Sequence, residues 1–350
     1  MTPSAGRRYH LNVDGNVNTK RVTLREVAEA AGVSINTASR ALNDKPAVNP
    51  YTKAKVLEAA QRLGYRPNRL ARALRYNKTK TLGVIVGDIA NPYFSMLVRG
   101  VEQTAREFDY SVILQGTDED YRREEEAVEV ALAERVDGIL ITPTQRSQDA
   151  IRILFESGTP FILMSRHFRD LETHYVIMDD QRGGYIATEH LIQRGHEKIA
   201  ILNGPVHISS AAERYAGYVE ALRANGLEIN EGLVIEGCLT LEDGYHAALR
   251  LLEGPHKPTA IFAFSDFVAL GVFRAANELG IRIPDELAVV GFDNTIFGLC
   301  TKPPLTSVGG SPEELGKMAA QLLLELLTGK RPNTVTRIKL PVYLVQRGSS

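Results

Sequence analysis

The sequence predicts an all-α helix-turn-helix headpiece followed by an α/β body of two doubly wound parallel-sheet subdomains. Between residues 23 and 64, apolar residues recur every three to four positions, which is the spacing of helices packed on one side. From Thr81 onward, short runs rich in Val and Ile alternate with helical patterns, as is typical of parallel sheets covered on both faces. The chain has 350 residues, enough for about two or three domains.

Residues 1–20 are polar and have no hydrophobic periodicity, so we expect a disordered arm. They lack the basic start and apolar run of a secretory signal, and no run in the chain is apolar enough to cross a membrane. Cys238 and Cys300 have no metal-binding spacing, and we expect two buried thiols in a reducing compartment. These features predict a cytoplasmic protein with no cofactor, no metal and no membrane partner.

The net charge of −1 conceals a strong asymmetry along the chain. Residues 20–80 contain 14 Lys and Arg against 4 Asp and Glu, a net charge of +10, whereas residues 81–350 carry −12. A basic segment attached to an acidic body is typical of a protein that binds the phosphate backbone of nucleic acids. A solvated charged surface is the alternative, but it does not explain why the excess lies beside the predicted helix-turn-helix.

The stretch from residue 23 to 43 predicts two short helices joined by a tight turn. Gly32 suits the turn because a residue without Cβ takes positive φ at little cost, and Ser34 suits the start of the second helix as its cap. Ala38 and Leu42 share one face of that second helix. A DNA-binding helix-turn-helix would place the second helix in a major groove, but an ordinary αα-hairpin fits these residues equally well.

The next residues favour the DNA-binding interpretation. Thr52–Gly64 predicts a third helix that completes a headpiece of residues 21–68. Arg69–Tyr76 is a basic segment that can form two helical turns, too few to be stable alone, within a hinge and linker of residues 69–80. Its Leu74 is the kind of side chain that opens base steps from the minor groove. The alternative is a plain basic linker.

The body contains nine predicted strands separated by helices. The strands are expected at Leu82–Val86, Ser111–Gln115, Gly138–Ile141, Phe161–Met164, Tyr175–Met178, Lys198–Leu202, Leu233–Glu236, Thr259–Phe264 and Leu287–Gly291. The helices include Pro92–Phe108, Tyr121–Glu134, Gly183–Arg194, Ala211–Asn225, Asp266–Leu279 and Pro312–Leu327. We expect an N-subdomain of about residues 81–180 and 311–328 and a C-subdomain of about residues 181–308 and 332–347.

Polar and aromatic side chains follow several predicted strands, at the position where open parallel sheets bind their ligands. These residues are Asp88, Asn91, Tyr93, Phe94, Ser165, Arg166, His167, Ser210, Arg214, Ser265, Asp266, Asp293 and Asn294. Aromatic faces stack on rings, and charged groups hold hydroxyls, so the set suits a sugar or a nucleobase. Tyr93 and Phe94 fit core packing about equally well, and Asp266 fits a helix cap better than a ligand contact. Arg214 and Asp293 are the stronger candidates for ligand contacts.

Enzyme signatures are absent from the sequence. It contains no G-x-G-x-x-G, no G-x-x-x-x-G-K-[ST], no G-x-S-x-G and no H-E-x-x-H. His190 and His196 do not form a metal motif. We therefore expect a binding protein rather than an enzyme.

In combination, the motifs of residues 22–347 resemble those of the lactose-repressor/galactose-repressor family of bacterial transcription factors. The motifs are VTLREVAEAAGVSINTASRALN, GYRPNRLARALR, TLGVIVGDIANPYF, RVDGILI, EHLIQRGHEKIAILNGP, RYAGYVEAL, PTAIFAFSDFVALG, GIRIPDELAVVGFDN and PPLTSV. The resemblance implies a periplasmic-binding-protein-like body. It also implies a sequence-specific transcriptional regulator, most commonly a repressor, in which a small molecule controls operator affinity allosterically.

The resemblance also assigns the DNA contacts. Bases would be read by Ile35, Asn36 and Arg40, since Arg is the usual reader of guanine and Asn can read adenine. Phosphates would be held by Ser34, Thr37, Ser39 and Asn43. The hinge contacts would be Asn68, Arg69, Ala73 and Leu74, with the leucine entering the minor groove. The DNA would be a double-stranded, near-palindromic operator bound by a homodimer.

The effector cleft is assigned in the same way. Tyr93, Phe94, Ser210, Arg214, Ser265 and Asp293 match positions that line the cleft of the family, and the strand-end residues Asp88 and Arg166 complete the candidate set. The Gly309-Gly310 pair stands where relatives often carry a long polar residue, so one contact is expected to be missing or replaced by water. The chain has no apolar heptad tail after its last strand, which favours a dimer over a tetramer.

The alternative function is that of an exported solute-binding protein, which shares the two-lobed body. It would need export and would not carry a basic helix-turn-helix. In the regulator, the open and closed states of the body would place the paired hinge segments at different separations. An effector that binds one state more tightly would shift the equilibrium between them. On this basis, Arg214→Ala is expected to abolish the effector response while leaving the fold intact.

Overall fold

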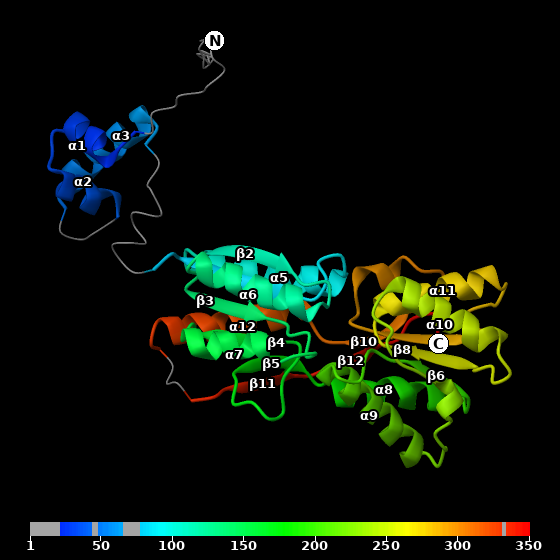
Figure 1. Cartoon of the computed structure of the whole chain (residues 1–350). Coiled ribbons are helices and arrows are strands. Elements are labelled where there is room, and N and C mark those ends of the chain that lie inside the picture. Colours follow the sequence, from blue (N-terminus) through cyan, green and yellow to red (C-terminus); the bar gives the residue numbers. More distant parts are fainter. Residues whose placement is uncertain (1–21, 44–47, 66–77, 331–333) are drawn as a thin grey trace, which may run out of the picture. The chain divides into compact units, whose positions relative to one another are not determined.

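The computed structural model describes residues 22–43, 48–65, 78–330 and 334–350 (Figure 1). The chain forms two units, residues 1–77 and 78–350. The predicted arm of residues 1–20 and the candidate DNA contacts Asn68, Arg69, Ala73 and Leu74 lie outside the described residues. Within the described ranges, no helix is both long and apolar enough to cross a lipid bilayer.

Three short helices form the headpiece. They are α1 (Leu24–Ala31), α2 (Ile35–Leu42) and α3 (Pro50–Leu63). Thr23 and Glu26 form a capping box at the start of α1, and Gly32 ends that helix with a φ of 62°. Ser34 accepts a hydrogen bond from the Thr37 backbone N–H and so caps α2. Small side chains form the core and allow the helices to pack closely: Val27, Ala28, Ala31, Ala38, Ala41, Val56, Ala59 and Ala60.

The first sheet of the body has six parallel strands in the order β11-β5-β4-β3-β1-β2 (Figure 1). The strands are β1 (Thr81–Val86), β2 (Ser111–Gly116), β3 (Gly138–Ile141), β4 (Phe161–Met164), β5 (Tyr175–Met178) and β11 (Arg337–Leu340). One face packs on α5 (Pro92–Glu107) and α12 (Pro312–Leu327). The other face packs on α6 (Tyr121–Ala133) and α7 (Asp149–Ser157). The central strands are buried on both faces, which explains their continuous apolar runs.

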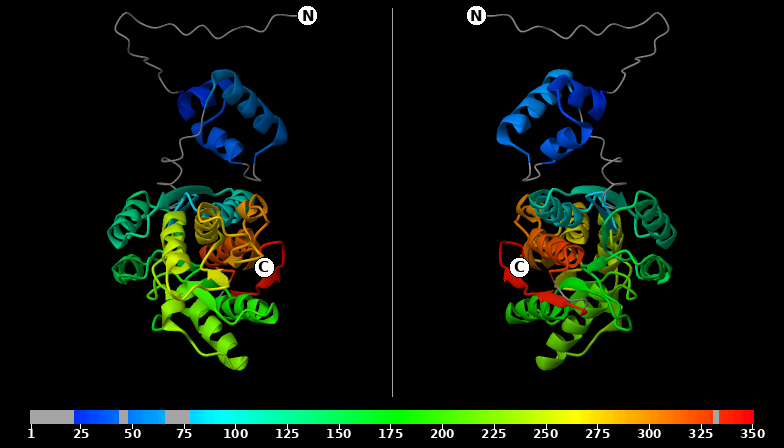
Figure 2. Two further views of the ribbon diagram at one scale, coloured as in Figure 1. Left: turned by 90° about the vertical axis from the view of Figure 1, so that its right-hand side faces the viewer. Right: turned by 90° about the vertical axis from the view of Figure 1, so that its left-hand side faces the viewer.

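The second sheet repeats this plan in the order β12-β10-β9-β8-β6-β7. Its strands are β6 (Ile199–Leu202), β7 (Val234–Ile235), β8 (Ala260–Ala263), β9 (Ala288–Phe292), β10 (Thr306–Gly309) and β12 (Tyr343–Val345). One face packs on α8 (Asp180–Gln193) and α9 (Ser209–Ala224), and the other packs on α10 (Leu241–Glu253) and α11 (Asp266–Glu278). The views in Figure 2 show helices on both sides of the sheets. The predicted fold class is confirmed: a helical headpiece and two parallel α/β subdomains.

The C-terminal part of the chain is divided between the two sheets, which corrects the predicted assignment of residues 332–347 to the C-subdomain. β11 pairs with β5 in parallel, so residues 337–340 belong to the first sheet. β12 alone joins the second sheet, antiparallel to β10. Both end strands are short and carry exposed side chains, so they lack the continuous apolar run that identified the central strands.

A 3₁₀ turn, η2 (Ile296–Leu299), follows β9 and presents apolar side chains to solvent. Ile296 is 67% exposed, Phe297 46% and Leu299 56%. Cys300 follows this turn and is also exposed, whereas Cys238 is buried. The expectation of two buried thiols is therefore wrong for Cys300, because its position at the end of an exposed turn is a property of the tertiary structure.

Helices α8 and α9 cross with backbone packed directly against backbone. A methyl group at Gly184 would overlap the carbonyl oxygen of Arg214, and one at Gly217 would overlap the carbonyl oxygen of Gln181. The absence of both Cβ atoms lets each helix rest on the backbone of the other. Two other helix pairs have the same reciprocal arrangement, through Gly100 and Gly316 and through Gly244 and Gly271.

Gly217→Ala is expected to destabilise the protein by about 1–3 kcal/mol, because the added methyl forces α8 and α9 apart. The higher helix propensity of Ala opposes this loss by at most about 1 kcal/mol. Urea denaturation followed by circular dichroism measures the difference. Arg223→Ala is the control, since Arg223 is exposed on the same helix and its loss is expected to stay within about 0.5 kcal/mol. Equal urea midpoints for Gly217→Ala and Arg223→Ala would show that Gly217 is not needed for the close crossing.

Candidate functional site

The first group of predicted site residues lies on and beside α2. Ser34, Ile35, Asn36 and Arg40 are exposed, and Ile35 is 44% exposed although it is apolar. Exposed side chains near the start of a second helix are placed as a major-groove reader requires.

Ser39 and Asn43 are placed differently from these four residues. Ser39 is only 9% exposed, and the side-chain amide of Asn43 donates to the Ser39 carbonyl at 2.7 Å. Thr37 is half-buried, and its hydroxyl lies 2.9 Å from that of Ser34. These hydrogen bonds hold the two ends of α2. The geometry therefore leaves Ser34, Ile35, Asn36 and Arg40 as the exposed side chains among the described members of the set.

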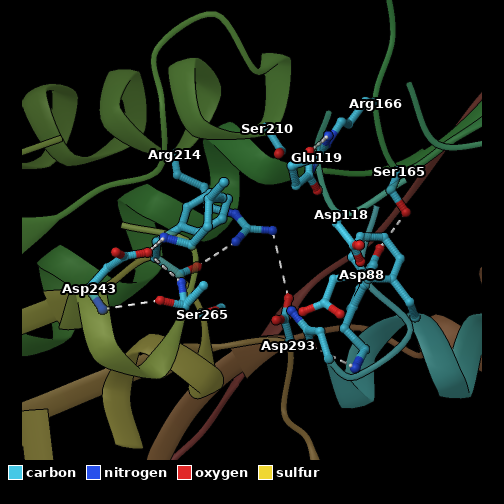
Figure 3. Close-up of a pocket in the computed structure, with 16 residues that line it drawn as sticks. Asp88, Asp118, Glu119, Ser165, Arg166, Ser210, Arg214, Asp243, Ser265 and Asp293 are labelled. Atoms are coloured by element: carbon cyan, nitrogen blue, oxygen red, sulfur yellow. Dashed lines mark hydrogen bonds and ion pairs between the residues drawn. The ribbon is translucent and has the colours of Figure 1, made fainter. Parts of the chain in front are cut away.

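The second group lines a cavity of about 310 Å³ between the two subdomains (Figure 3). The N-subdomain contributes Asp88, Asn91, Tyr93, Phe94, Asp118, Glu119, Ser165 and Arg166. The C-subdomain contributes Ser210, Arg214, Leu239, Thr240, Asp243, Phe264, Ser265 and Asp293. All eight candidate residues from the sequence line this one cavity. The prediction that ligands bind beyond the carboxyl ends of parallel strands succeeds here, because those ends of both sheets face the cavity.

Eight lining residues were not among the candidates. Asn91 and Ser165 follow predicted strands but are outside the set of eight, and Phe264 is the last residue of a predicted strand. The others also follow predicted strands: Asp118, Glu119, Leu239, Thr240 and Asp243. Applying the same rule to every strand would have found them. Only the tertiary structure shows which of them pair with a candidate.

Arg214, in the wall of the cavity, makes polar contacts with three residues. Its Nε donates to Asp180 Oδ1 at 2.8 Å, its Nη1 donates to the Phe264 carbonyl, and its Nη2 lies 3.7 Å from Asp293 Oδ1. Its guanidinium carbon also lies 3.6 Å from the centroid of the Phe292 ring. Burial raises the pKa of Asp180 and of Asp293, and the nearby guanidinium opposes that rise. Arg214 is thus part of a buried ionic network as well as a wall of the cavity.

The position of Arg214 follows from the helix crossing described above. Asp180 begins α8, and Arg214 lies on α9, where its backbone carbonyl rests on Gly184. Ser210, one turn earlier on α9, is 7% exposed and lines the same cavity. The close crossing therefore sets the distance between the guanidinium and its carboxylate.

On the opposite wall, Arg166 forms a bidentate pair with Glu119. Its Nη1 and Nη2 each donate to a carboxylate oxygen of Glu119 at 2.7 Å, and Nη1 also donates to the Pro143 carbonyl at 2.9 Å. The side chains of Arg166 and Glu119 are 6% and 19% exposed. Gly87 leaves room for this pair, because a Cβ there would overlap the Glu119 carboxylate. Parallel hydrogen bonds of this kind fix both side chains in orientation.

Four lining residues have left-handed backbone, which is uncommon for residues with a Cβ. The φ angles are 49° at Asp118, 57° at Glu119, 63° at Ser165 and 100° at Asp293. Each residue turns the chain sharply just after a strand. Glycine would adopt these backbone conformations with less strain.

Aromatic residues form the apolar part of the wall. Tyr93 and Phe94 are 8% and 6% exposed, with ring centroids 5.3 Å apart in an edge-to-face arrangement. The Tyr93 hydroxyl lies 2.7 Å from the Ser165 hydroxyl, and burial raises the pKa of Tyr93. The two interpretations considered for this pair are compatible: the rings pack into the core and border the cavity.

Ser265 and Asp266 both make structural hydrogen bonds at the start of α11. The Ser265 hydroxyl accepts from the Val268 N–H at 3.1 Å and so caps α11. The Asp266 carboxylate accepts from Thr295 N–H at 2.6 Å and from the Ser307 hydroxyl at 2.5 Å, and it does not line the cavity. The helix-cap interpretation of Asp266 is therefore wrong, because Ser265 is the cap, and the Asp266 carboxylate instead binds Thr295 and Ser307. Ser265 borders the cavity and retains its hydroxyl hydrogen for a second partner.

Beside the cavity, loops of the N-subdomain bind the start of α9 in the C-subdomain. No side chain of the residue preceding α9 caps this helix, and Gln145 Oε1 instead accepts from Ser209 N–H at 2.8 Å. His167 N–H donates to the Ser209 hydroxyl at 3.1 Å, and Gln145 Nε2 donates to the His167 carbonyl at 2.8 Å. His167 Nε2 also lies 3.6 Å from Glu213 Oε1. These contacts join the two subdomains at the rim of the cavity.

Comparisons with known proteins match both units of the chain. Residues 23–68 match the family model of bacterial regulatory proteins of the lacI family, and residues 79–348 match that of periplasmic binding proteins and the sugar binding domain of the LacI family. The HTH-type transcriptional repressor PurR of Haemophilus influenzae (strain PittEE) is 36% identical over 332 residues, covering 93% of this chain and 98% of that protein.

Two further comparisons extend over nearly the whole chain. The ribose operon repressor of Escherichia coli (strain K12) is 34% identical over 330 residues, covering 94% of this chain and 99% of that protein. The structure of the lac repressor dimer bound to operator and the anti-inducer ONPF aligns with a TM-score of 0.85 at 32% identity, covering 94% and 99% of the two chains.

Arg214→Ala is expected to lower the free energy of unfolding by about 3–5 kcal/mol, because it leaves Asp180 and Asp293 buried without their cation. The buried ion pairs thus predict a less stable variant, whereas the sequence alone predicted an intact fold. Chemical denaturation of the purified variant measures the loss. Arg274→Ala removes an exposed pair with Glu242 and is expected to cost about 1 kcal/mol or less. A variant at Arg214 as stable as the wild type would contradict the ionic network.

Proposed function

This chain belongs to the LacI family of bacterial regulatory proteins, and we propose that it represses transcription as a homodimer whose operator affinity is set by a small molecule in the cavity. It is a DNA-binding repressor with an effector-binding α/β domain, and it is not an enzyme. As a regulator of this family it is cytoplasmic. The observation that carries the function is the joining of a family-matched helix-turn-helix to a body with a polar cavity between two lobes.

The alternative of an exported solute-binding protein does not account for the whole chain. It explains the two-lobed body but leaves residues 23–68 and the basic charge of residues 20–80 without a role. A repressor uses both parts, because the positive charge attracts the phosphate backbone and the exposed face of α2 reads base edges.

For the DNA complex, we assign base reading to Ile35, Asn36 and Arg40. These three side chains are exposed on α2, and guanidinium and amide groups form bidentate hydrogen bonds with guanine and adenine. Ser34 and Thr37 are assigned to phosphates at the start of the helix. Ser39 and Asn43 would contribute mainly by fixing the end of α2, in keeping with the burial of Ser39 and the hydrogen bond between them.

Effector control follows from a cavity whose wall is divided between two lobes. A ligand that contacts Arg166 on one lobe and Ser210 on the other binds the closed arrangement more tightly than an open one. The hydrogen bond from Ser209 N–H to Gln145 Oε1 joins the two lobes and would support the closed arrangement. Residues 69–80 link this equilibrium to the headpiece, and operator binding in turn shifts effector affinity by the same factor.

Dimer formation supplies the two headpieces that a near-palindromic operator requires. The exposed apolar turn η2 is our candidate for part of the dimer contact, because apolar side chains gathered in one exposed turn are buried favourably against a second copy. The lac repressor structure that aligns with this chain is itself a dimer.

Arg40→Ala is expected to weaken binding to the cognate operator by about 1–3 kcal/mol and to relax base preference at the position it reads. Gel shifts with the operator and with single-base variants measure both effects. Arg62→Ala is the control, since Arg62 is an exposed cation on α3 outside the predicted contacts, and it is expected to leave base preference unchanged. Unchanged preference in the Arg40 variant would show that α2 does not read bases.

Phe297→Glu is expected to shift the protein from dimer toward monomer, because it places a charge in the proposed apolar contact. Sedimentation equilibrium measures the dissociation constant. Phe155→Glu is a matched control, since Phe155 is 51% exposed on α7, away from η2, and we expect no change in self-association. A dimer equally tight in both variants would remove η2 from the interface.

A further inference from the structure

We infer that the effector is an uncharged polyhydroxylated molecule, and that Glu119 makes the cavity reject its phosphorylated or carboxylated counterparts. This inference rests on the proposed function, because it concerns the ligand of the same cavity. The cavity contains two guanidinium groups, which would normally favour an anion, but both are already paired with carboxylates of the protein.

The pairing of Arg166 leaves little capacity for a bound anion. Both of its terminal nitrogens donate to Glu119 at 2.7 Å, which is the bidentate geometry that a phosphate or a ligand carboxylate would otherwise occupy. Glu119 keeps this position at a φ of 57°, in the left-handed region. Gly87 leaves the space that the carboxylate fills. The chain therefore holds its own anion where a ligand anion would bind.

The pairing of Arg214 leads to the same conclusion for the other lobe. Its Nε donates to Asp180 at 2.8 Å, and one terminal nitrogen donates to the Phe264 carbonyl. The remaining terminal nitrogen lies 3.7 Å from Asp293 Oδ1, a distance that leaves it able to donate to a neutral hydroxyl. A second buried anion beside Asp293 would meet like-charge repulsion.

The net charge of the lining is negative. Five carboxylates line the cavity against two guanidiniums: Asp88, Asp118, Glu119, Asp243 and Asp293. Asp118 is paired with Arg123, which lies outside the lining. Burial raises the pKa of Asp293, and a neutral Asp293 would still leave carboxylates in excess. A phosphate ester would add up to two negative charges to this surface.

The N-termini of α10, α5 and α11, a kind of position that often binds phosphate, carry acceptors supplied by the protein itself. The Asp243 carboxylate accepts from Leu239 N–H at 3.0 Å and from Thr240 N–H at 2.8 Å at the start of α10. Asn91 accepts from Tyr93 N–H at 3.0 Å at the start of α5. Ser265 caps α11 in the same way. These helix ends therefore do not form a phosphate cradle.

What the cavity does offer suits hydroxyl groups. Carboxylates of Asp88 and Asp243 and hydroxyls of Ser165 and Ser210 accept hydrogen bonds from several directions, and a polyol carries a donor on nearly every carbon. The rings of Tyr93, Phe94 and Phe264 supply apolar faces for the C–H side of a sugar ring. A nucleobase has fewer donors than acceptors to match this wall, so the polyol is the better partner.

The test compares each uncharged sugar with its own phosphate on the full-length protein. Thermal shift and calorimetric titration are run with D-ribose, D-ribose 5-phosphate, D-glucose, D-glucose 6-phosphate, cellobiose and hypoxanthine. We expect at least one uncharged sugar to raise Tm, and the tested phosphate of a binding sugar to bind at least about tenfold more weakly. The Kd of the uncharged sugar is expected to be the same at low and high salt, because no net charge is transferred.

Glu119→Gln tests the residue assignment. The substitution keeps the side-chain length but releases Arg166 from its counter-charge, so the ratio of the two Kd values, phosphate over sugar, is expected to fall by about tenfold. Glu126→Gln is the matched control, since Glu126 is exposed on α6 outside the cavity, and the ratio should not move. Should the Glu119 variant fail to fold, the salt dependence and the sugar–phosphate ratio of the wild type still decide the ligand class.

Several results would overturn the inference. Tighter binding of a phosphate than of its parent sugar would do so, as would binding of hypoxanthine with no response to any sugar, or no response to the whole panel by a protein that binds its operator. An unchanged ratio in Glu119→Gln would remove Glu119 from the selectivity. Operator binding is measured separately by gel shift. If the protein shows no preference for any DNA sequence in that assay, the proposed function is refuted, whatever the ligand measurements show.

Discussion

The close crossing of α8 and α9 is the constraint on which the rest of the cavity depends. Two glycines, Gly184 and Gly217, let each helix rest against the backbone of the other. That contact places Arg214 within 2.8 Å of Asp180 and over the Phe292 ring, at 3.6 Å from its centroid. A guanidinium held in this way can serve as a rigid wall of a binding site, because its own hydrogen bonds fix its position before any ligand arrives.

The cavity also lies between the two sheets of the body. Each sheet has helices on both faces, and one hydrophobic cluster contains residues of both sheets, whereas at the rim of the cavity the lobes meet through hydrogen bonds such as that from Ser209 N–H to Gln145. Hydrogen bonds contribute about 1 kcal/mol each, so the rim contacts add only modestly to the preference for one arrangement of the lobes. A ligand of ordinary affinity can therefore shift the equilibrium, which is what a regulator requires.

Charge is used in opposite ways by the two units. The headpiece region concentrates uncompensated positive charge, and Arg40 is exposed to solvent. In the body, Arg166 and Arg214 are buried and neutralised by carboxylates of the chain itself. The first arrangement attracts a polyanion at long range, and the second fixes geometry while keeping anions out. The same residue type thus serves DNA binding in one unit and selection of a neutral ligand in the other.

The sequence by itself determined the fold class, the helix-turn-helix and the eight candidate residues of the cavity, because these follow from local periodicity and from the rule that ligands bind beyond strand ends. It did not reveal that β11 returns to the first sheet, that Cys300 is exposed, or that Glu119 pairs with Arg166 and Asp180 with Arg214. Pairs such as Arg166 with Glu119, 47 residues apart, leave no periodic pattern. Local patterns decide which elements form, and only the packed structure decides which side chains from distant elements meet.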